Sequence, residues 1–197
     1  MAIPELTRVF GQYGLYLRPS PAFSTDLSGN MLANIISLTR DQGRLGGQLR
    51  CLDGELPIGT GSLSLVYALF MIETSPDPEG LMQEIARSLK PEGVALVISL
   101  NPWSLARLRW FAQPVRVAGS STVERLARDA GLDVIRRQFI GPFWASATSA
   151  VPDGRGHGWL DGFRAASLMV LRRREAALTP LRKAASAVSL RPGMSVG

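Results

Sequence analysis

A stretch of under 40 residues constrains the fold of this chain more than any other feature. A nearly continuous apolar run over 64–72 is typical of a strand buried on both faces of a parallel sheet. Asp77 and Pro78 then mark a helix start, apolar residues recur at helical spacing as far as Leu89, and a second apolar run follows over 94–100. Strand, helix and strand in this order predict a right-handed βαβ unit with parallel strands. The sequence therefore indicates an α/β fold.

The C-terminal side of the chain continues this alternation. Residues 120–130 are expected to form a helix capped by Ser120 or Ser121, because their apolar side chains fall on one helical face. Strands are predicted over 132–140 and 165–171.

The N-terminal third is predicted to contribute three short strands, over 15–17, 33–38 and 48–52. The intervening residues 41–47 have the composition of a turn rather than of a helix. The second and third of these strands can therefore be either an antiparallel hairpin or two parallel strands.

Length and charge define the domain and its tail. With 197 residues, 46% of them apolar, the chain suits one domain over 1–174. Residues 175–197 form a basic C-terminal tail that we expect to wrap the surface or to be partly disordered. The net charge of +6 comes from residues 155–197, which carry eight basic and two acidic side chains. No aromatic residues interleave with the basic residues from Arg172 onward, which argues against nucleic acid as the partner.

Several function classes are excluded by composition. Cys51 and His157 are the only cysteine and histidine, so a disulfide framework, a zinc cluster and a Ser-His-Asp triad are not expected, and no metal site is predicted. The longest apolar stretch, 58–72, is shorter than the ~20 residues that a membrane span needs. The first ten residues lack the pattern of a secretory signal, so a cytoplasmic protein is expected.

Within residues 56–104 the chain resembles a known family. An LP pair precedes the first buried strand, a D-P-x-x-L-x-x-E helix follows it, and an N-P-x-S turn follows the next strand. This pattern is similar to that of the class I S-adenosylmethionine-dependent methyltransferases, specifically the methyltransferase type 11 family and its small bacterial members. The residues that carry the resemblance are Leu56, Pro57, Glu73, Asp77, Pro78, Leu81, Glu84, Arg87, Leu89, Pro91, Gly93, Asn101, Pro102 and Ser104.

The resemblance implies a fold and an activity. The fold would be a Rossmann-like class I methyltransferase sheet of seven mostly parallel strands, here with an abridged N-terminal half. S-adenosylmethionine would lie over the C-terminal ends of the first strands, in agreement with the general rule for open α/β sheets. The activity would be transfer of a methyl group to an unidentified small-molecule acceptor.

The resemblance also implies which positions would contact the cofactor. The place of the family's G-x-G-x-G loop is taken by 18–22, an arginine followed by Pro-Ser-Pro-Ala, so the glycine-rich loop is missing. Asp41 stands where the ribose would be gripped, and Asp53 is one residue from the position of the adenine-side acid, which is Leu52. The candidate cofactor-binding residues are therefore Arg18, Asp41, Asp53, Leu56, Phe70 and Glu73.

The substrate side is less defined. Asn101, Trp103 and Trp144 are candidates for contacts with the acceptor, and Glu73 or Asp53 for a base.

Three departures from the family pattern, at 18–22, Leu52 and Phe70, fall on the same expected pocket. They raise a second hypothesis, in which the chain is a catalytically inactive pseudo-methyltransferase that acts as a binding or partner-subunit module. The sequence leaves the enzyme and the pseudoenzyme open.

Overall fold

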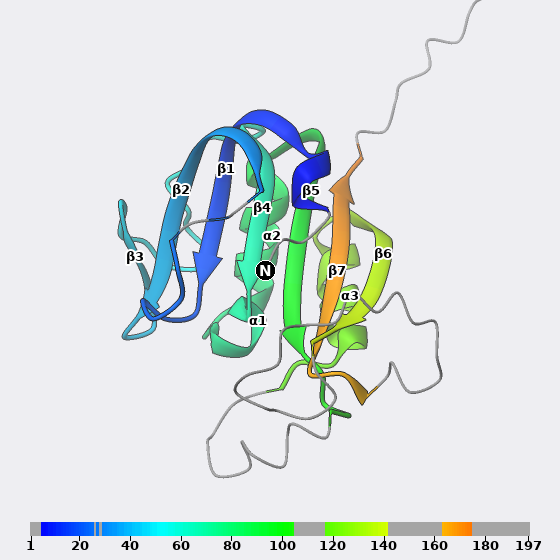
Figure 1. The fold of residues 1–197 in the computed structure, drawn as a ribbon. Coiled ribbons are helices and arrows are strands. Elements are labelled where there is room, and N and C mark those ends of the chain that lie inside the picture. Colours follow the sequence, from blue (N-terminus) through cyan, green and yellow to red (C-terminus); the bar gives the residue numbers. More distant parts are fainter. Residues whose placement is uncertain (1–4, 26, 28, 105–116, 142–162, 175–197) are drawn as a thin grey trace, which may run out of the picture.

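A seven-stranded sheet forms the centre of the computed structural model, which describes residues 5–25, 27, 29–104, 117–141 and 163–174. The strand order across the sheet is β3-β2-β1-β4-β5-β7-β6 (Figure 1). The strands are β1 (Phe10–Arg18), β2 (Met31–Asp41), β3 (Arg44–Gly47), β4 (Leu63–Leu69), β5 (Leu89–Leu100), β6 (Leu132–Ile140) and β7 (Ala166–Arg173).

Most strands of this sheet run in one direction. β2, β1, β4 and β5 pair in parallel with their neighbours. β7 is antiparallel to β5, and β6 is antiparallel to β7, so β6 again runs with the central strands. Only β3 and β7 are reversed. The prediction of a Rossmann-like sheet of seven mostly parallel strands is confirmed.

The α-helices lie behind the sheet in Figure 1. They are α1 (Met71–Thr74), α2 (Pro78–Ser88) and α3 (Ser120–Asp129), and a 3-10 turn, η1 (Leu6–Arg8), precedes β1. As predicted, Asp77 caps α2, since its Oδ1 accepts a hydrogen bond of 2.9 Å from the Gly80 N–H. The predicted cap of α3 is wrong: the N-cap residue is Gly119, and it makes no side-chain capping bond.

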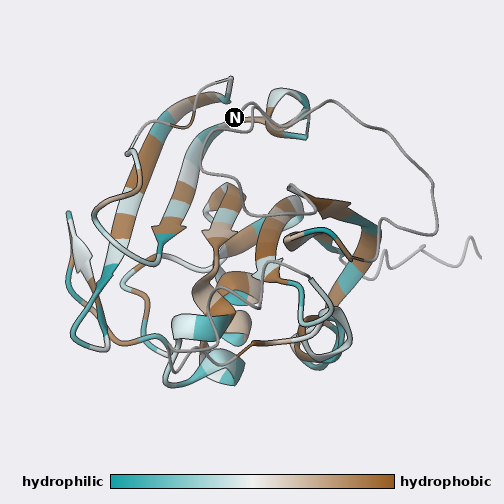
Figure 2. Cartoon of the chain, turned by 60° about the horizontal axis from the view of Figure 1, so that its bottom comes forward, coloured by the Kyte–Doolittle hydropathy of each residue, from teal (hydrophilic) through white to brown (hydrophobic). Residues whose placement is uncertain are grey.

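Two apolar clusters lie on the two faces of the sheet. On the helix side, Leu81, Met82 and Ile85 of α2 pack with alternate residues of β1, β4 and β5. The opposite face carries Tyr16, Leu65, Tyr67, Leu96, Ile98 and Leu168, and is covered in part by Leu6 and Leu27. Among the described residues no α-helix packs on this second face. Figure 2 shows hydrophobic colouring on the central strands and in bands along β2, whereas the turn between β2 and β3 is hydrophilic.

The N-terminal strands differ from the prediction in two ways. The predicted strand over 48–52 is wrong: β3 precedes this segment, in which only Cys51 makes an isolated bridge to Leu45. β2 and β3 form an antiparallel hairpin, which settles the alternative that the sequence left open. Gln42 and Gly43 at its turn have φ of 45° and 79°, as a tight two-residue hairpin requires.

Two other segments lie next to the strands. The apolar run over 64–72 is not all strand: β4 ends at Leu69, and Met71 begins α1. Between β1 and β2, residues 19–30 contain no helix where the structure describes them.

No described helix is long and apolar enough to cross a membrane. The tail over 175–197 lies outside the described residues.

Candidate functional site at the C-terminal edge of the sheet

The ends of β1, β2, β4 and β5 meet at one edge of the sheet, because these strands are parallel. This is the edge at which open α/β sheets bind ligands. Most of the predicted site residues follow these strand ends and are brought to the same edge: Arg18, Asp41, Phe70, Glu73, Asn101 and Trp103.

Arg18 is buried at the end of β1. The side chain is only 6% exposed, and its guanidinium carbon lies 5.7 Å from the centre of the Tyr16 ring. Nη1 donates a hydrogen bond to the carbonyl oxygen of Phe23, so the connection after β1 folds back over the arginine. Pro19 and Pro21 in this connection have no N–H group to offer a ligand.

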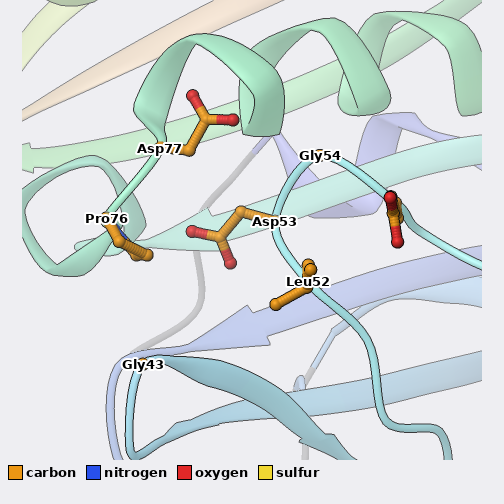
Figure 3. A pocket seen from close by; sticks show the side chains of 7 residues that line it. Gly43, Leu52, Asp53, Gly54, Pro76 and Asp77 are labelled. Carbon is orange, nitrogen blue, oxygen red and sulfur yellow. The ribbon is translucent and has the colours of Figure 1, made fainter.

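Asp53 is engaged by its own chain. Both of its oxygens accept from the Arg40 guanidinium, with 2.9 Å between Nη2 and Oδ2, and Oδ2 also accepts from the Ser75 hydroxyl. The two charged side chains are 8% and 1% exposed. Figure 3 shows the Asp53 carboxylate between its own loop and the connection at Pro76. The network therefore ties β2, the loop after β3 and the start of α2 together.

A pocket lies above this network. Its volume is about 360 Å³, at the lower end of the range for small-molecule sites. The lining residues come from the β2–β3 turn, the loop after β3 and the segment before α2: Gly43, Leu52, Asp53, Gly54, Glu55, Pro76 and Asp77 (Figure 3).

Glu73 joins α1 to the end of β5. Oε1 accepts a hydrogen bond of 2.5 Å from the Leu100 N–H, and the residue is 6% exposed. Oε2 is buried and has no hydrogen-bond partner among the residues that the structure describes. Burial raises the pKa of the Glu73 carboxyl to about 7, against which the hydrogen bond from the Leu100 N–H acts only in part.

Phe70 and Leu56 have structural roles. Phe70 has a left-handed backbone with φ of 50°, rare for an aromatic residue, and forms the sharp turn from β4 into α1. Its N–H donates to the carbonyl oxygen of Ile98. The Leu56 side chain lies in the core, while its N–H donates to Glu84 Oε2 and its carbonyl accepts from Arg87.

Among the remaining predicted residues, those that the structure describes are not part of the pocket lining. Asp41 is exposed at the hairpin turn, opposite Arg44. Asn101 is buried and donates from Nδ2 to the carbonyl oxygen of Arg164, which fixes the turn after β5 against the start of β7. Trp103 is 77% exposed. Trp144 lies outside the described residues.

The sequence analysis missed Arg40 and Ser75, which share Asp53. No local pattern could have identified them, since they lie 13 and 22 residues away from Asp53 and meet it only after the hairpin and α1 have formed. The one available signal was Arg40 itself, because it is a charged residue at a strand position that otherwise faces the core.

Comparison with known proteins agrees with this architecture. Residues 6–97 match the family model of a methyltransferase domain, Methyltransf_11. The chain is 28% identical over 129 residues to the biotin biosynthesis bifunctional protein BioHC of Cellvibrio japonicus, covering 61% of this chain and 25% of that protein. It is 34% identical over 97 residues to the malonyl-[acyl-carrier protein] O-methyltransferase of Methylovorus sp., covering 47% and 33%. The chain thus spans a quarter to a third of the length of these relatives.

A solved structure shares the fold. In the complex of the Haloferax volcanii Trm112 methyltransferase activator with a methyltransferase, the similar chain aligns with a TM-score of 0.54 at 17% identity, and 86% of each chain is covered. The matched segment and the strand order together make this chain similar to the class I S-adenosylmethionine-dependent methyltransferases, with the family-model match covering just under half of the chain.

Proposed function

We propose that this chain is a binding or partner-subunit module on a methyltransferase fold, and that it does not hold S-adenosylmethionine in the family's cofactor position. The burial of Arg18 carries this proposal. The arginine and two prolines stand where the family has a glycine-rich loop, and the guanidinium fills the space between Tyr16 and the Phe23 carbonyl. Free amides at a helix N-terminus bind the anionic end of a ligand. The described part of this connection contains no helix, and Pro19 and Pro21 in it have no N–H group.

The use of Asp53 within the chain supports the same proposal. A carboxylate that grips a nucleoside must present its oxygens to the pocket, whereas Asp53 is 2% exposed and both of its oxygens already accept hydrogen bonds from Arg40 and Ser75. Exchanging a buried ion pair for a ligand would leave the Arg40 charge uncompensated. The adenine-side role that the resemblance implies for this residue is therefore disfavoured.

Apolar side chains at the same edge favour a partner with an apolar surface. Four exposed large apolar residues lie in the connections next to these strands. They are Phe23 after β1, Leu52 before β4, Trp103 after β5 and Phe163 before β7. Their exposure is typical of a docking surface rather than of a core. A protein is the partner class we propose, and the structurally similar Haloferax volcanii chain is itself found in complex with a protein activator.

Methyl transfer is the second candidate, and Glu73 is the observation in its favour. Its buried carboxyl has a raised pKa of about 7, near the value at which a general base works best at neutral pH. Its free Oε2 atom could accept a proton from an acceptor. The sulfonium of the cofactor is already an activated donor, so the site would mainly supply orientation.

Cofactor titration separates the two candidates. In isothermal titration calorimetry with up to millimolar S-adenosylmethionine or S-adenosylhomocysteine, we expect no saturable heat from the full chain. Arg18→Gly, which clears the space and the charge, serves as the matched variant and tests whether the arginine is what blocks the site. Saturable micromolar binding by the unaltered chain would overturn the proposal and favour the methyltransferase.

A further inference from the structure

A group of hydrogen-bond donors without acceptors lies on the sheet face opposite the helices. Arg18 Nε, Ser37 Oγ and Thr39 Oγ1 are all buried and have no hydrogen-bond partner in the part of the chain that the structure describes. Buried polar atoms are nearly always paired, so a group of three unpaired atoms requires an explanation. A ligand or ordered water that is not part of the chain is the usual one.

The strand register brings these three residues together. β1 and β2 pair in parallel with Arg18 opposite Thr39 and Tyr16 opposite Ser37. Paired residues of neighbouring strands point to the same face and lie about 5 Å apart. The contact between the Arg18 guanidinium and the Tyr16 ring places the arginine on this same face.

The charge of this group is uncompensated. Arg18 is 6% exposed, and no described carboxylate lies within ion-pair distance of it. The other charged side chain buried in this half of the sheet, Arg40, has Asp53 as its partner. A buried cation without a partner is strongly unfavourable, so an anion at this place would stabilise the fold.

The neighbouring tyrosines match an anion as well. The rings of Tyr16 and Tyr67 lie next to each other, with centroids 5.2 Å apart. Burial raises the pKa of both hydroxyls, so both remain neutral donors at neutral pH. All the polar side chains named on this face therefore donate hydrogen bonds, and none of them carries a negative charge.

We propose that Arg18, Ser37 and Thr39 form a binding site for an oxyanion, a carboxylate or a phosphate, beneath the connection between β1 and β2. The guanidinium supplies the charge through Nε, and the two hydroxyls donate from the neighbouring strand. Residues 19–25, held over Arg18 by the bond from its Nη1 to the Phe23 carbonyl, would cover the anion. This site goes beyond the proposed function; both are argued from the buried Arg18, and the anion titration and the cofactor titration test them separately.

Titration with inorganic phosphate and with acetate, at ionic strength held constant by sodium chloride, tests the site. We expect saturable binding by calorimetry and a rise in melting temperature with one or both anions. The stronger of the two identifies the group that the natural ligand carries. If neither anion shifts the melting temperature beyond the chloride control, the proposal is wrong; a carboxylate of the chain that fills the site would give this same result.

Three variants localise the binding. Thr39→Val is nearly isosteric and removes one bond to a charged group, so the affinity should fall about tenfold. Arg18→Met should abolish saturable binding, while Arg125→Met, which removes an exposed arginine on α3, should leave it unchanged. If Arg18→Met does not fold, the affinity of Thr39→Val for the anion still tests the proposal. Equal affinity in Thr39→Val and the unaltered chain, or an equal loss in Arg125→Met, would overturn the proposal.

Discussion

The two halves of the sheet are held together in different ways. In the half formed by β4, α2 and β5, apolar strands pack on an apolar helix face, with Leu81, Met82 and Ile85 fully buried. In the half formed by β1, β2 and β3, long helical connections are replaced by a loop and a tight hairpin. There a buried polar network, Arg40 with Asp53 and Ser75, joins segments that a helix would otherwise hold. One half thus rests on apolar packing against a helix, and the other half on polar contacts between strands and loops.

The first prediction tests the polar half of the sheet by removing one member of its buried ion pair. Asp53→Ala leaves the Arg40 charge buried and unpaired, so the free energy of unfolding should fall by about 4 kcal/mol. Urea denaturation followed by circular dichroism measures it. The double variant Arg40→Met with Asp53→Leu removes both charges and should recover most of the loss. A loss below about 1 kcal/mol for Asp53→Ala would show that the network adds little stability.

The second prediction tests the apolar half of the sheet at Ile85, a residue that is about as buried as Asp53. Ile85→Ala opens a cavity between α2 and the sheet, and the free energy of unfolding should fall by about 3 kcal/mol. Unlike the loss in Asp53→Ala, this loss cannot be recovered by replacing a charged partner, because Ile85 has none. The smaller change Ile85→Val should lower the free energy of unfolding by only about 1 kcal/mol. If Ile85→Ala proves nearly neutral, the contrast between the two halves does not hold.

The third prediction concerns pH. The pKa of Glu73 is raised to about 7, so the folded state binds more protons than the unfolded state between pH 4.5 and pH 7. Stability should therefore fall as the pH rises through this window, by about 2 kcal/mol between pH 5 and pH 7. Glu73→Gln should remove this part of the slope. An unchanged slope in Glu73→Gln would assign the pH dependence to other groups.

The fourth and smallest prediction tests the start of α2. Asp77→Ala removes the side-chain bond to the Gly80 N–H and should lower the free energy of unfolding by about 1 kcal/mol. Asp77→Asn keeps an accepting oxygen and should cost only a few tenths of a kcal/mol. Equal losses in the two variants would point to the charge of Asp77 rather than to its capping bond.

The contrast between the halves also explains what the sequence could predict. The βαβ unit, α3, and the strand over 132–140 follow from local signals, namely apolar periodicity, the Asp77-Pro78 start and the stop at Gly131. The third strand was misplaced by several residues, because the short Arg44–Gly47 segment has little strand propensity and forms by pairing with β2.

The candidate site was less predictable than the fold. Its residues were brought to the expected edge of the sheet, since parallel strands end together. Which of them are engaged within the chain depends on contacts between distant segments. The burial of Arg18 results from the return of the chain at Phe23, and the pairing of Asp53 from the position of Arg40 on β2. Only Arg40 has a signal in the sequence, as a charged residue at a core-facing strand position, and that signal does not identify its partner.

The hairpin of β3 also affects how this protein behaves in concentrated solution. An unpaired strand edge is a template on which another chain can add a strand and start an aggregate. β3 covers the flank of the eleven-residue β2 with only four residues, and Gly47 ends it in a backbone conformation, φ 141°, that few other residues adopt. At the far flank, β6 carries the charged pair Arg136 and Arg137. The β6 flank is thus protected by charge, whereas at the other flank only Leu38–Asp41 of β2 pair with β3, so among the described residues the rest of β2 is the edge more open to strand addition.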